Sequence, residues 1–269
     1  CPTIPTSGVT SVNATQNVPQ IVSGAAEGAS FVFEPGTYND IAISPKNGQK
    51  FYAKPGVILQ GSRTGTEKMA FNSKASNVYI CGFVVKNYNT PRQRAAIDNS
   101  GGGSNWIIEN VDVSGSTFGG AQIGSGTLMR NSRIHHNDDI GIKASGSVGA
   151  TYDNVEVDNN ANHPETEWGW EGGATKFAYT TNFTIRNSFI HHNYGPGLWT
   201  DLENKGSLFE RNLIEDNTAM GIFHEVSYDI VIRDNIIRRN GLKDTCGNWT
   251  FRCGGIYISS SHTTDGKTI

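Results

Sequence analysis

Short apolar stretches of three to five residues alternate with polar turns along most of the chain, without a run of helical periodicity. The pattern is clearest between Gly172 and Gly255, where one kind of unit occurs three times. Each unit opens with a glycine and a short apolar strand, passes through a polar turn, and runs a second strand that ends near an asparagine. Such a repeat predicts a solenoid, because no unit could bury its apolar face alone.

Asparagines set the register of this predicted solenoid. Aligning the units gives two columns, which contain Asn187, Asn212 and Asn235 in the first and Asn193, Asn217 and Asn240 in the second. Upstream, the first column continues through Asn110, Asn131 and Asn154. Units stacked in register stand about 4.8 Å apart, so that aligned asparagine side chains hydrogen-bond to each other and to the turn backbone. The sequence therefore predicts an all-β fold, a right-handed parallel β-helix with asparagine ladders.

This repeat resembles the right-handed parallel β-helix (pectate-lyase-like) family of carbohydrate-active proteins, from roughly residue 30 to the end. We expect a leader over residues 1–29, which are rich in Ser, Thr, Pro, Gly and Ala, and a single β-helix domain over residues 30–269. The resemblance implies that a polysaccharide binds along one parallel sheet, in a groove walled by loops. This fold hosts many chemistries, however, and the chain lacks the catalytic motifs of pectate lyases, mannuronan epimerases and polygalacturonases.

Two long excursions interrupt the repeat, at residues 162–172 and 241–254. Both leave at the same bend, just before a glycine-led strand, so both are predicted to overhang the same side. Long loops over one face of a solenoid commonly build its binding site. Trp168, Trp170 and Glu171 of the first loop are therefore candidate substrate-binding residues, although loops of this kind are also found as decoration.

The alternation in the glycine-led strands predicts an outward-facing column of Trp199, Phe223 and Tyr257. An exposed aromatic strip suits the apolar face of sugar rings, and Tyr194 lies on the approach to it. The alternative interpretation is that the overhanging loops or another protein cover these rings, since burying each of them is favourable by a few kcal/mol.

The same alternation predicts an outward charged column of Lys176, Asp201 and Glu225, the candidate catalytic residues. Asp201 and Glu225 one strand apart would raise the pKa of one carboxyl and give the acid and base of glycoside hydrolysis. In a lyase, acidic residues would neutralise a uronate, with or without calcium, while lysine removes a proton. No cofactor is certain, calcium is the one considered, and structural ion pairing of Lys176 with Asp201 is the competing interpretation.

The histidines give a weaker signal. His135–His136 and His191–His192 recur at equivalent positions near a bend, which more often reports turn structure than catalysis or metal binding. His224 adjoins Glu225, but its predicted direction is inward, which favours a core histidine.

Cysteine usage points to an oxidising compartment, because four cysteines without a CxxC pair favour disulfides over zinc. Cys246 and Cys253 are predicted to close the second loop, while Cys1 is expected either to pair with Cys81 or to carry a lipid anchor. The protein is therefore expected to be secreted or on the cell surface.

A net charge of −3 gives no electrostatic case for nucleic acid, and no apolar run reaches the length of a membrane span. The expected function is an extracellular polysaccharide-degrading enzyme, a glycoside hydrolase or polysaccharide lyase. The alternative is a non-catalytic β-helix, an adhesin, tailspike-like or filament-forming protein. The last coil, which the sequence leaves without a cap, would then self-associate through bare strand edges.

Overall fold

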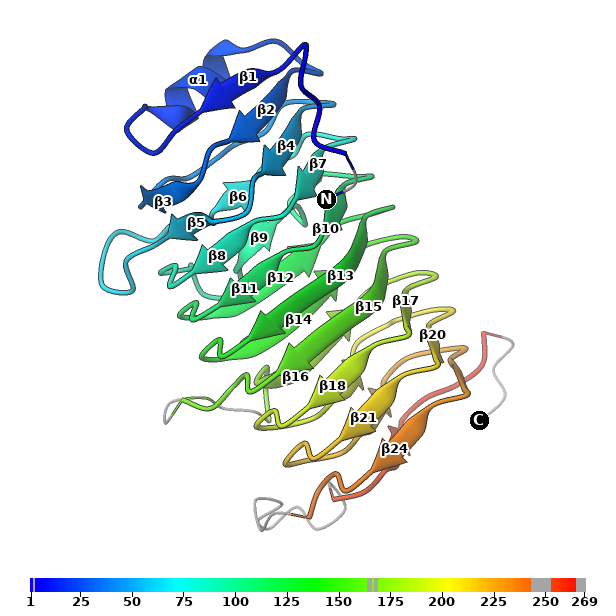
Figure 1. Ribbon diagram of the computed structural model, residues 1–269. Coiled ribbons are helices and arrows are strands. Elements are labelled where there is room, and N and C mark those ends of the chain that lie inside the picture. The colour runs from blue at the N-terminus through cyan, green and yellow to red at the C-terminus, as the bar shows by residue number, and fades with distance from the viewer. Residues whose placement is uncertain (2, 164–165, 167–168, 243–252, 265–269) are drawn as a thin grey trace.

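The protein is a right-handed parallel β-solenoid of about nine turns, seen in a computed structural model that describes residues 1, 3–163, 166, 169–242 and 253–264. Successive coils stack from the N-terminal end to the C-terminal end, so that the chain forms an elongated body (Figure 1). The predicted fold class is confirmed. None of the described helices is long and apolar enough to cross a membrane.

Two parallel sheets form the walls of the coil. Sheet A comprises β1 (Thr10–Val12), β2 (Ser30–Phe33), β3 (Gly36–Asn39), β4 (Lys50–Ala53), β5 (Val57–Gln60), β7 (Tyr79–Cys81), β8 (Val84–Lys86), β10 (Ile107–Glu109), β11 (Asp112–Ser114), β13 (Leu128–His135), β15 (Thr151–Asp158), β17 (Thr184–Arg186), β18 (Phe189–His191), β20 (Leu208–Glu210), β21 (Leu213–Glu215), β23 (Val231–Arg233) and β24 (Ile236–Arg238). Sheet B comprises β6 (Phe71–Asn72), β9 (Ala95–Asp98), β12 (Gly119–Ile123), β14 (Ile140–Ser145), β16 (Gly173–Ala178), β19 (Leu198–Thr200), β22 (Ile222–Glu225) and β25 (Ile256–Ser259).

The core lies between the sheets and is filled by the inward residues of each strand. Phe177, Phe183 and Phe209 are fully buried there, and the rings of Phe177 and Phe183 lie 4.1 Å apart between centroids. His224 is also fully buried, and its Nδ1 lies 2.6 Å from the hydroxyl of Thr200. The predicted inward direction of His224 is therefore confirmed.

The second predicted asparagine column is a buried ladder. The Asn193 side-chain amide donates to Asn217 Oδ1 at 2.9 Å, and Asn217 donates in the same way to Asn240. The ladder begins two coils earlier than predicted, with Asn137 and Asn160 bonded in series to Asn193. Each side chain also accepts the backbone N–H of the preceding coil, so the ladder satisfies polar groups that would otherwise be buried unpaired.

The first predicted column was aligned one residue out of register. Strand pairing sets Arg186 level with Glu210, so Asn187 lies level with Arg211, and Asn212 lies level with Ser188. Asn187 belongs instead to a bend of sheet A where each coil has a left-handed residue, as Asn131 and Asn154 also do, with φ near 50°. Asparagine tolerates this conformation better than most residues. Asparagine thus recurs at two adjacent positions, at one because of the left-handed backbone and at the next because of its side-chain hydrogen bonds.

The N-terminal residues cover the first coil. β1 pairs in parallel with β2, and the short helix α1 (Val18–Gly24) buries Val18 and Val22 against the core. The expected leader therefore includes a strand and a helix that close one end of the solenoid.

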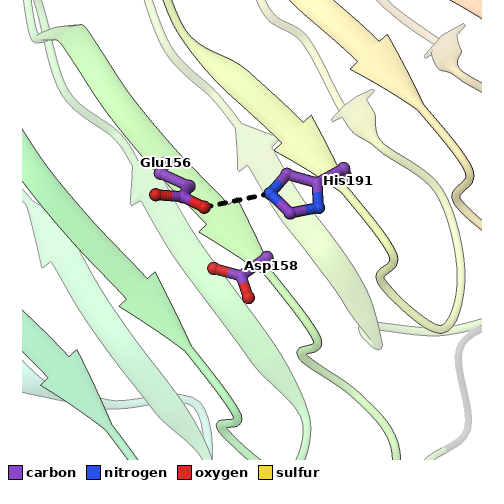
Figure 2. A group of neighbouring side chains, drawn as sticks. All are labelled: Glu156, Asp158 and His191. Carbon is purple, nitrogen blue, oxygen red and sulfur yellow. Dashed lines mark hydrogen bonds and ion pairs between the residues drawn. The ribbon is translucent and has the colours of Figure 1, made fainter.

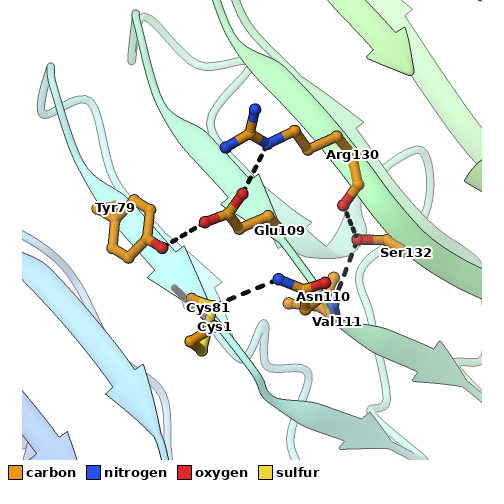
Figure 3. Close-up of a disulfide and its surroundings, with 8 residues drawn as sticks. All are labelled: Cys1, Tyr79, Cys81, Glu109, Asn110, Val111, Arg130 and Ser132. Atoms are coloured by element: carbon orange, nitrogen blue, oxygen red, sulfur yellow. Dashed lines mark hydrogen bonds and ion pairs between the residues drawn. A yellow bond between two sulfur atoms is a disulfide. The ribbon is translucent and has the colours of Figure 1, made fainter. Parts of the chain in front are cut away.

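A disulfide joins Cys1 to Cys81, with the Cα atoms 5.7 Å apart, and ties the N-terminus to sheet A (Figure 3). Of the two expectations for Cys1, the disulfide is the one confirmed. Beside it, Glu109 accepts hydrogen bonds from Tyr79 and from Arg130 Nε. The predicted pairing of Cys246 with Cys253 stays a prediction, because Cys246 lies outside the described residues.

Both excursions leave the solenoid at the predicted bend. The first lies between β15 and β16 and the second between β24 and β25, so each connects a strand of sheet A to the next strand of sheet B. The described part of the first loop therefore lies beside the start of sheet B.

We predict that Asn193→Ala lowers the melting temperature by roughly 5–10 °C, which corresponds to about 2–4 kcal/mol of lost stability. The change removes the hydrogen bond from the Asn193 side chain to Asn217. It also leaves the side-chain amide of Asn160 without its acceptor, which is Asn193 Oδ1. Thermal unfolding followed by circular dichroism measures the shift. Asn39→Ala, at an exposed strand position, is the control and should leave the melting temperature nearly unchanged.

We predict that His224→Leu reduces the loss of stability on acidification. Burial lowers the pKa of His224 to about 4 from its usual 6.5. Between those values the unfolded chain takes up a proton that the folded chain does not, so stability falls as the pH drops through this window. The fall in unfolding free energy between pH 7 and pH 4.5 should be smaller in the variant by roughly 1–2 kcal/mol. An equal fall in both proteins, or an equal effect of the exposed control His262→Leu, would contradict this account.

Candidate functional site

The outward face of sheet A carries a ladder of ion pairs whose arginines are exposed. Arg130 pairs with the buried Glu109 at 2.6 Å and Arg186 with Asp153 at 2.9 Å. The arginine side chains are 40% or more exposed. Each exposed arginine satisfies a carboxylate of the neighbouring coil, so we interpret this ladder as structural.

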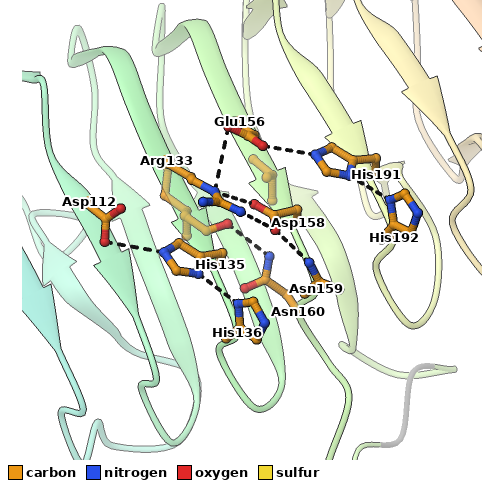
Figure 4. A network of polar contacts seen from close by, with 12 residues as sticks. Asp112, Arg133, His135, His136, Glu156, Asp158, Asn159, Asn160, His191 and His192 are labelled. Carbon is orange, nitrogen blue, oxygen red and sulfur yellow. Dashed lines mark hydrogen bonds and ion pairs between the residues drawn. The ribbon is translucent and has the colours of Figure 1, made fainter.

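The paired histidines lie on the same face, next to carboxylates (Figure 4). His191 Nε2 lies 3.1 Å from Glu156, and its Nδ1 lies 2.7 Å from Nδ1 of His192. His135 and His136 repeat the arrangement, with Asp112 as the carboxylate. His136 and His192 both adopt left-handed φ at a bend, which confirms that these positions are equivalent turn positions.

Glu156, Asp158 and His191 are the one group of described residues whose ligand atoms are close enough to hold a metal ion (Figure 2). Arg133 already lies against this group, with both Nε and a terminal nitrogen 2.9 Å from the two Asp158 oxygens. Although burial alone would raise the pKa of Asp158, hydrogen bonds from Arg133 and Asn159 lower it. The guanidinium thus supplies the positive charge that a metal would supply, and we assign the group a structural role.

Sheet B differs, because its outward lysines Lys143 and Lys176 are buried. Strand pairing sets Gln122, Lys143 and Lys176 in one outward column. The pairing of Phe177 with Thr200 makes Lys176 level with Trp199, and the column continues through Phe223 and Tyr257. The predicted aromatic column is therefore present, but Lys176 belongs to it and not to the column of Asp201 and Glu225. The prediction was wrong because the long loop before β16 hides the register of that strand.

The aromatic column is not exposed as predicted. Trp199 and Phe223 are only 2% and 3% exposed, and their rings stack 5.4 Å apart at an interplanar angle of 18°. They form a small apolar cluster outside the main core with Ala219 and Met220, against which Tyr257 packs. Trp199 and Phe223 are therefore covered, but the neighbours seen to pack on them include Ala219 and Met220, which belong to neither of the two long loops.

Lys176 still contacts two of the predicted site residues, Asp201 and Trp199, although it lies in a different column from the one predicted. Its Nζ lies 3.0 Å from Asp201 and 4.0 Å from the centroid of the Trp199 ring, and the side chains of Lys176 and Asp201 are only 10% and 14% exposed. Glu225 accepts a hydrogen bond from Trp199 Nε1 at 3.1 Å. The two carboxylates thus have different partners, and the ion pair expected as the competing interpretation is present.

Two lysines of sheet B hold the first loop in place. Lys176 Nζ donates to the backbone carbonyl of Trp170, and Lys143 Nζ lies 2.8 Å from Glu171. Lys143 and Glu171 are both more than nine-tenths buried, and the second carboxylate oxygen of Glu171 is buried without a hydrogen-bond partner. Buried charges are costly unless paired, so these contacts fix the segment Trp170–Glu171 over sheet B.

A cleft of about 450 Å³ opens beside this segment. Trp170, 43% exposed, forms one wall, and the Arg92 guanidinium lies 4.7 Å from the centroid of its ring. The residues that line the cleft are Arg92, Thr117, Phe118, Asp138, Asp139, His163, Thr166 and Trp170. The cleft therefore combines an aromatic wall with several polar and charged side chains that could fix the orientation of a bound molecule.

Asp139 lines the cleft and has a raised pKa. Burial raises its pKa to about 6, helped by the negative charge of Glu171 and opposed by Lys143 and Arg92. Asp138 beside it is paired with Arg63 at 2.5 Å. Perturbed carboxyls in a cleft are candidates for acid–base chemistry.

Sequence reasoning missed Arg92 and Asp139. The available signal was the position of Asp138 and Asp139, two acids at the bend that precedes a strand of sheet B. Of the predicted binding residues, Trp170 reaches the cleft, Glu171 is buried with Lys143, and Tyr194 and Tyr257 are half-buried elsewhere on the chain. Trp168 lies outside the described residues.

Solved structures share this architecture at low sequence identity. Tailspike protein 2 of bacteriophage CBA120, in its enzymatically active domain, superposes with a TM-score of 0.67 at 13% identity over 91% of this chain, which spans 39% of the tailspike chain. Pectate lyase Pel9A gives 0.55 at 15% identity, covering 92% of this chain and 80% of the lyase. PfbA, a surface adhesin of Streptococcus pneumoniae, gives 0.55 at 13% identity, covering 94% and 77%.

At these identities the likeness shows the fold alone. No curated protein matches the sequence significantly. The family described as the right handed beta helix region, however, matches residues 95–269, which is more than half of the chain. The chain therefore belongs to the right-handed β-helix family.

Proposed function

We propose that this protein is a secreted or surface-exposed enzyme that binds a polysaccharide along the outward face of sheet B and cleaves it. The observation that carries the proposal is the contrast between the two sheets. The arginines of sheet A stay exposed, whereas Lys143 and Lys176 of sheet B are buried and both contact a loop that walls an open cleft. Desolvated charges beside an open cleft are a common feature of functional sites.

The fold family supports the substrate class. A tailspike domain, a pectate lyase and a surface adhesin share this architecture, and two of them are named as enzymatically active. In our proposal Trp170 contacts a sugar ring, Lys176 and Asp201 hold the loop, and Glu225 lies farther along the same face. The catalytic roles predicted for Lys176, Asp201 and Glu225 remain part of the proposal, as does the involvement of calcium.

The test is a panel of neutral and uronate-containing polysaccharides, scored for new reducing ends and for the ultraviolet absorbance of unsaturated uronates, with and without chelator. We expect wild type to cleave at least one glycan. Both signals together indicate elimination, and reducing ends alone indicate hydrolysis. Sensitivity to chelator would add a metal requirement.

Asp201→Asn should lower the cleavage rate by at least tenfold, because it leaves the buried Lys176 without its carboxylate and loosens the Trp170 wall. Glu225→Gln tests the second predicted carboxylate in the same assay. The matched control is Asp153→Asn, which breaks an exposed ion pair with Arg186 on sheet A and should leave the rate unchanged. Full activity in both sheet B variants would remove Asp201 and Glu225 from the site.

A non-catalytic binding role is the second candidate, and the last described coil favours it. Ile256 and Ile258 of β25 are 48% and 43% exposed, and β25 is an edge strand of sheet B in the described part of the chain. Exposed isoleucines on a described edge strand suit self-association. If this role is correct, light scattering should show a molecular mass that increases with protein concentration. The protein should then cleave no polysaccharide in the panel. A monomer at all concentrations would contradict this role.

A further inference from the structure

We propose that Asp139 donates the proton to the leaving oxygen when the glycan is cut in the cleft beside Trp170. The inference rests on the proposed function, because it assigns a residue to that cleavage. Asp139, which directly precedes β14, would be a catalytic residue that the sequence analysis did not predict. Its basis is the position of Asp139 within the cleft, the surface that faces it, and the charges around it.

The position of Asp139 is fixed by its backbone. The residue directly precedes β14, and its carbonyl oxygen accepts the N–H of Gly173 at 3.1 Å. That bond ties it to the first residue of β16, where the loop returns to sheet B. Asp139 therefore stands on a rigid part of the solenoid, while the loop forms the opposite wall. A catalytic group held by regular structure keeps its geometry better than one on a free loop.

The cleft offers a sugar ring a surface as well as a proton donor. Trp170 contributes an aromatic face that is 43% exposed, and Arg92 lies against that ring. Phe118 lines the cleft and contacts Lys143, whose Nζ lies 5.4 Å from the ring centroid. The rings of Trp170 and Phe118 lie among polar side chains in the cleft, and partial burial of a carboxyl beside them favours its protonated form, as in other acid-catalysed glycan cleavage.

The charges that surround the Asp139 carboxyl have opposing effects on its pKa. Burial and the carboxylates of Glu171 and Asp138 raise its pKa, whereas the cations of Lys143 and Arg92 lower it, and the result is about 6. The other charged or titratable groups on the elements packed there are Arg63, which pairs with Asp138, and His163, which lines the cleft. The carboxyl thus holds its proton in mildly acidic solution and can give it up in one step.

The proposed step is the same for both routes of cleavage. The proton moves from the Asp139 carboxyl to the glycosidic oxygen as the carbon–oxygen bond breaks, and the bonding electron pair stays on that oxygen. In hydrolysis, the oxygen of a water molecule bonds to the sugar carbon, and the proton that water loses restores the carboxyl. In elimination, a base removes the ring proton and that C–H pair forms the double bond, while solvent reprotonates Asp139. A neutral carboxyl is required in either case, so the rate should fall as the pH rises through about 6.

Asp139→Asn tests the proposal on a polysaccharide that wild type cleaves in the panel above. We expect kcat to fall by at least 100-fold and the decline in kcat above pH 6 to disappear. The melting temperature at pH 8 should rise or stay equal, because burial disfavours the ionised carboxylate and the neutral amide removes that cost. A residue with only a structural role would instead lower stability and leave the shape of the pH profile intact. Asp153→Asn again serves as the matched control.

The outcomes separate the two proposals. If wild type cleaves a glycan, and Asp139→Asn retains both its rate and its pH profile, the role of Asp139 is wrong and the proposed function stands. If Asp139→Asn loses activity together with stability, the role of Asp139 is also overturned, in favour of a structural one. If wild type cleaves nothing in the panel, the proposed function fails and the role of Asp139 fails with it.

Discussion

Strand-on-strand register is the constraint on which the rest of this structure depends. Each coil places its residues one strand spacing from the equivalent residues of its neighbours, so every position becomes a column. A column is stable only if its members are compatible with one another. The ladder through Asn193 satisfies this condition by hydrogen bonding in series. The outward face of sheet A satisfies it by placing arginines beside carboxylates.

This constraint explains why the sequence predicts the fold so well. Solenoid columns repeat at nearly constant spacing, so Asn193, Asn217 and Asn240 are visible as a column without any structure. The error in the first column has the same origin. Asn187 occupies a bend that requires a left-handed conformation, whereas Asn212 occupies a buried ladder one position later. Identical side chains at adjacent positions satisfy different needs, and spacing alone cannot separate a backbone requirement from a hydrogen-bond requirement.

The site was predicted less well, because it is built where the repeat fails. The long interval before β16 hid the register of Lys176, which stacks on Trp199 and still reaches Asp201 with its long side chain. Alternation correctly gave the outward direction of Trp199 and Phe223, but direction does not determine exposure. Their burial depends on neighbours such as Met220, which lies outside the strands. Arg92 and Asp139 line one cleft together with Trp170 of the loop, a grouping that has no periodicity in the sequence.

The difference between the two sheets follows from where the loop lies. On sheet A the arginines remain exposed to water, even where the carboxylate that they pair with, such as Glu109, is buried. On sheet B the segment Trp170–Glu171 removes water from Lys143 and Lys176, so each lysine must find a partner, and the available partners are the loop itself and Asp201. Burial also raises the pKa of Asp139, which lines the open cleft beside this segment. One insertion into a regular solenoid is therefore sufficient to bury two lysines of an outward column and to form a cleft beside them that contains a carboxyl with a raised pKa.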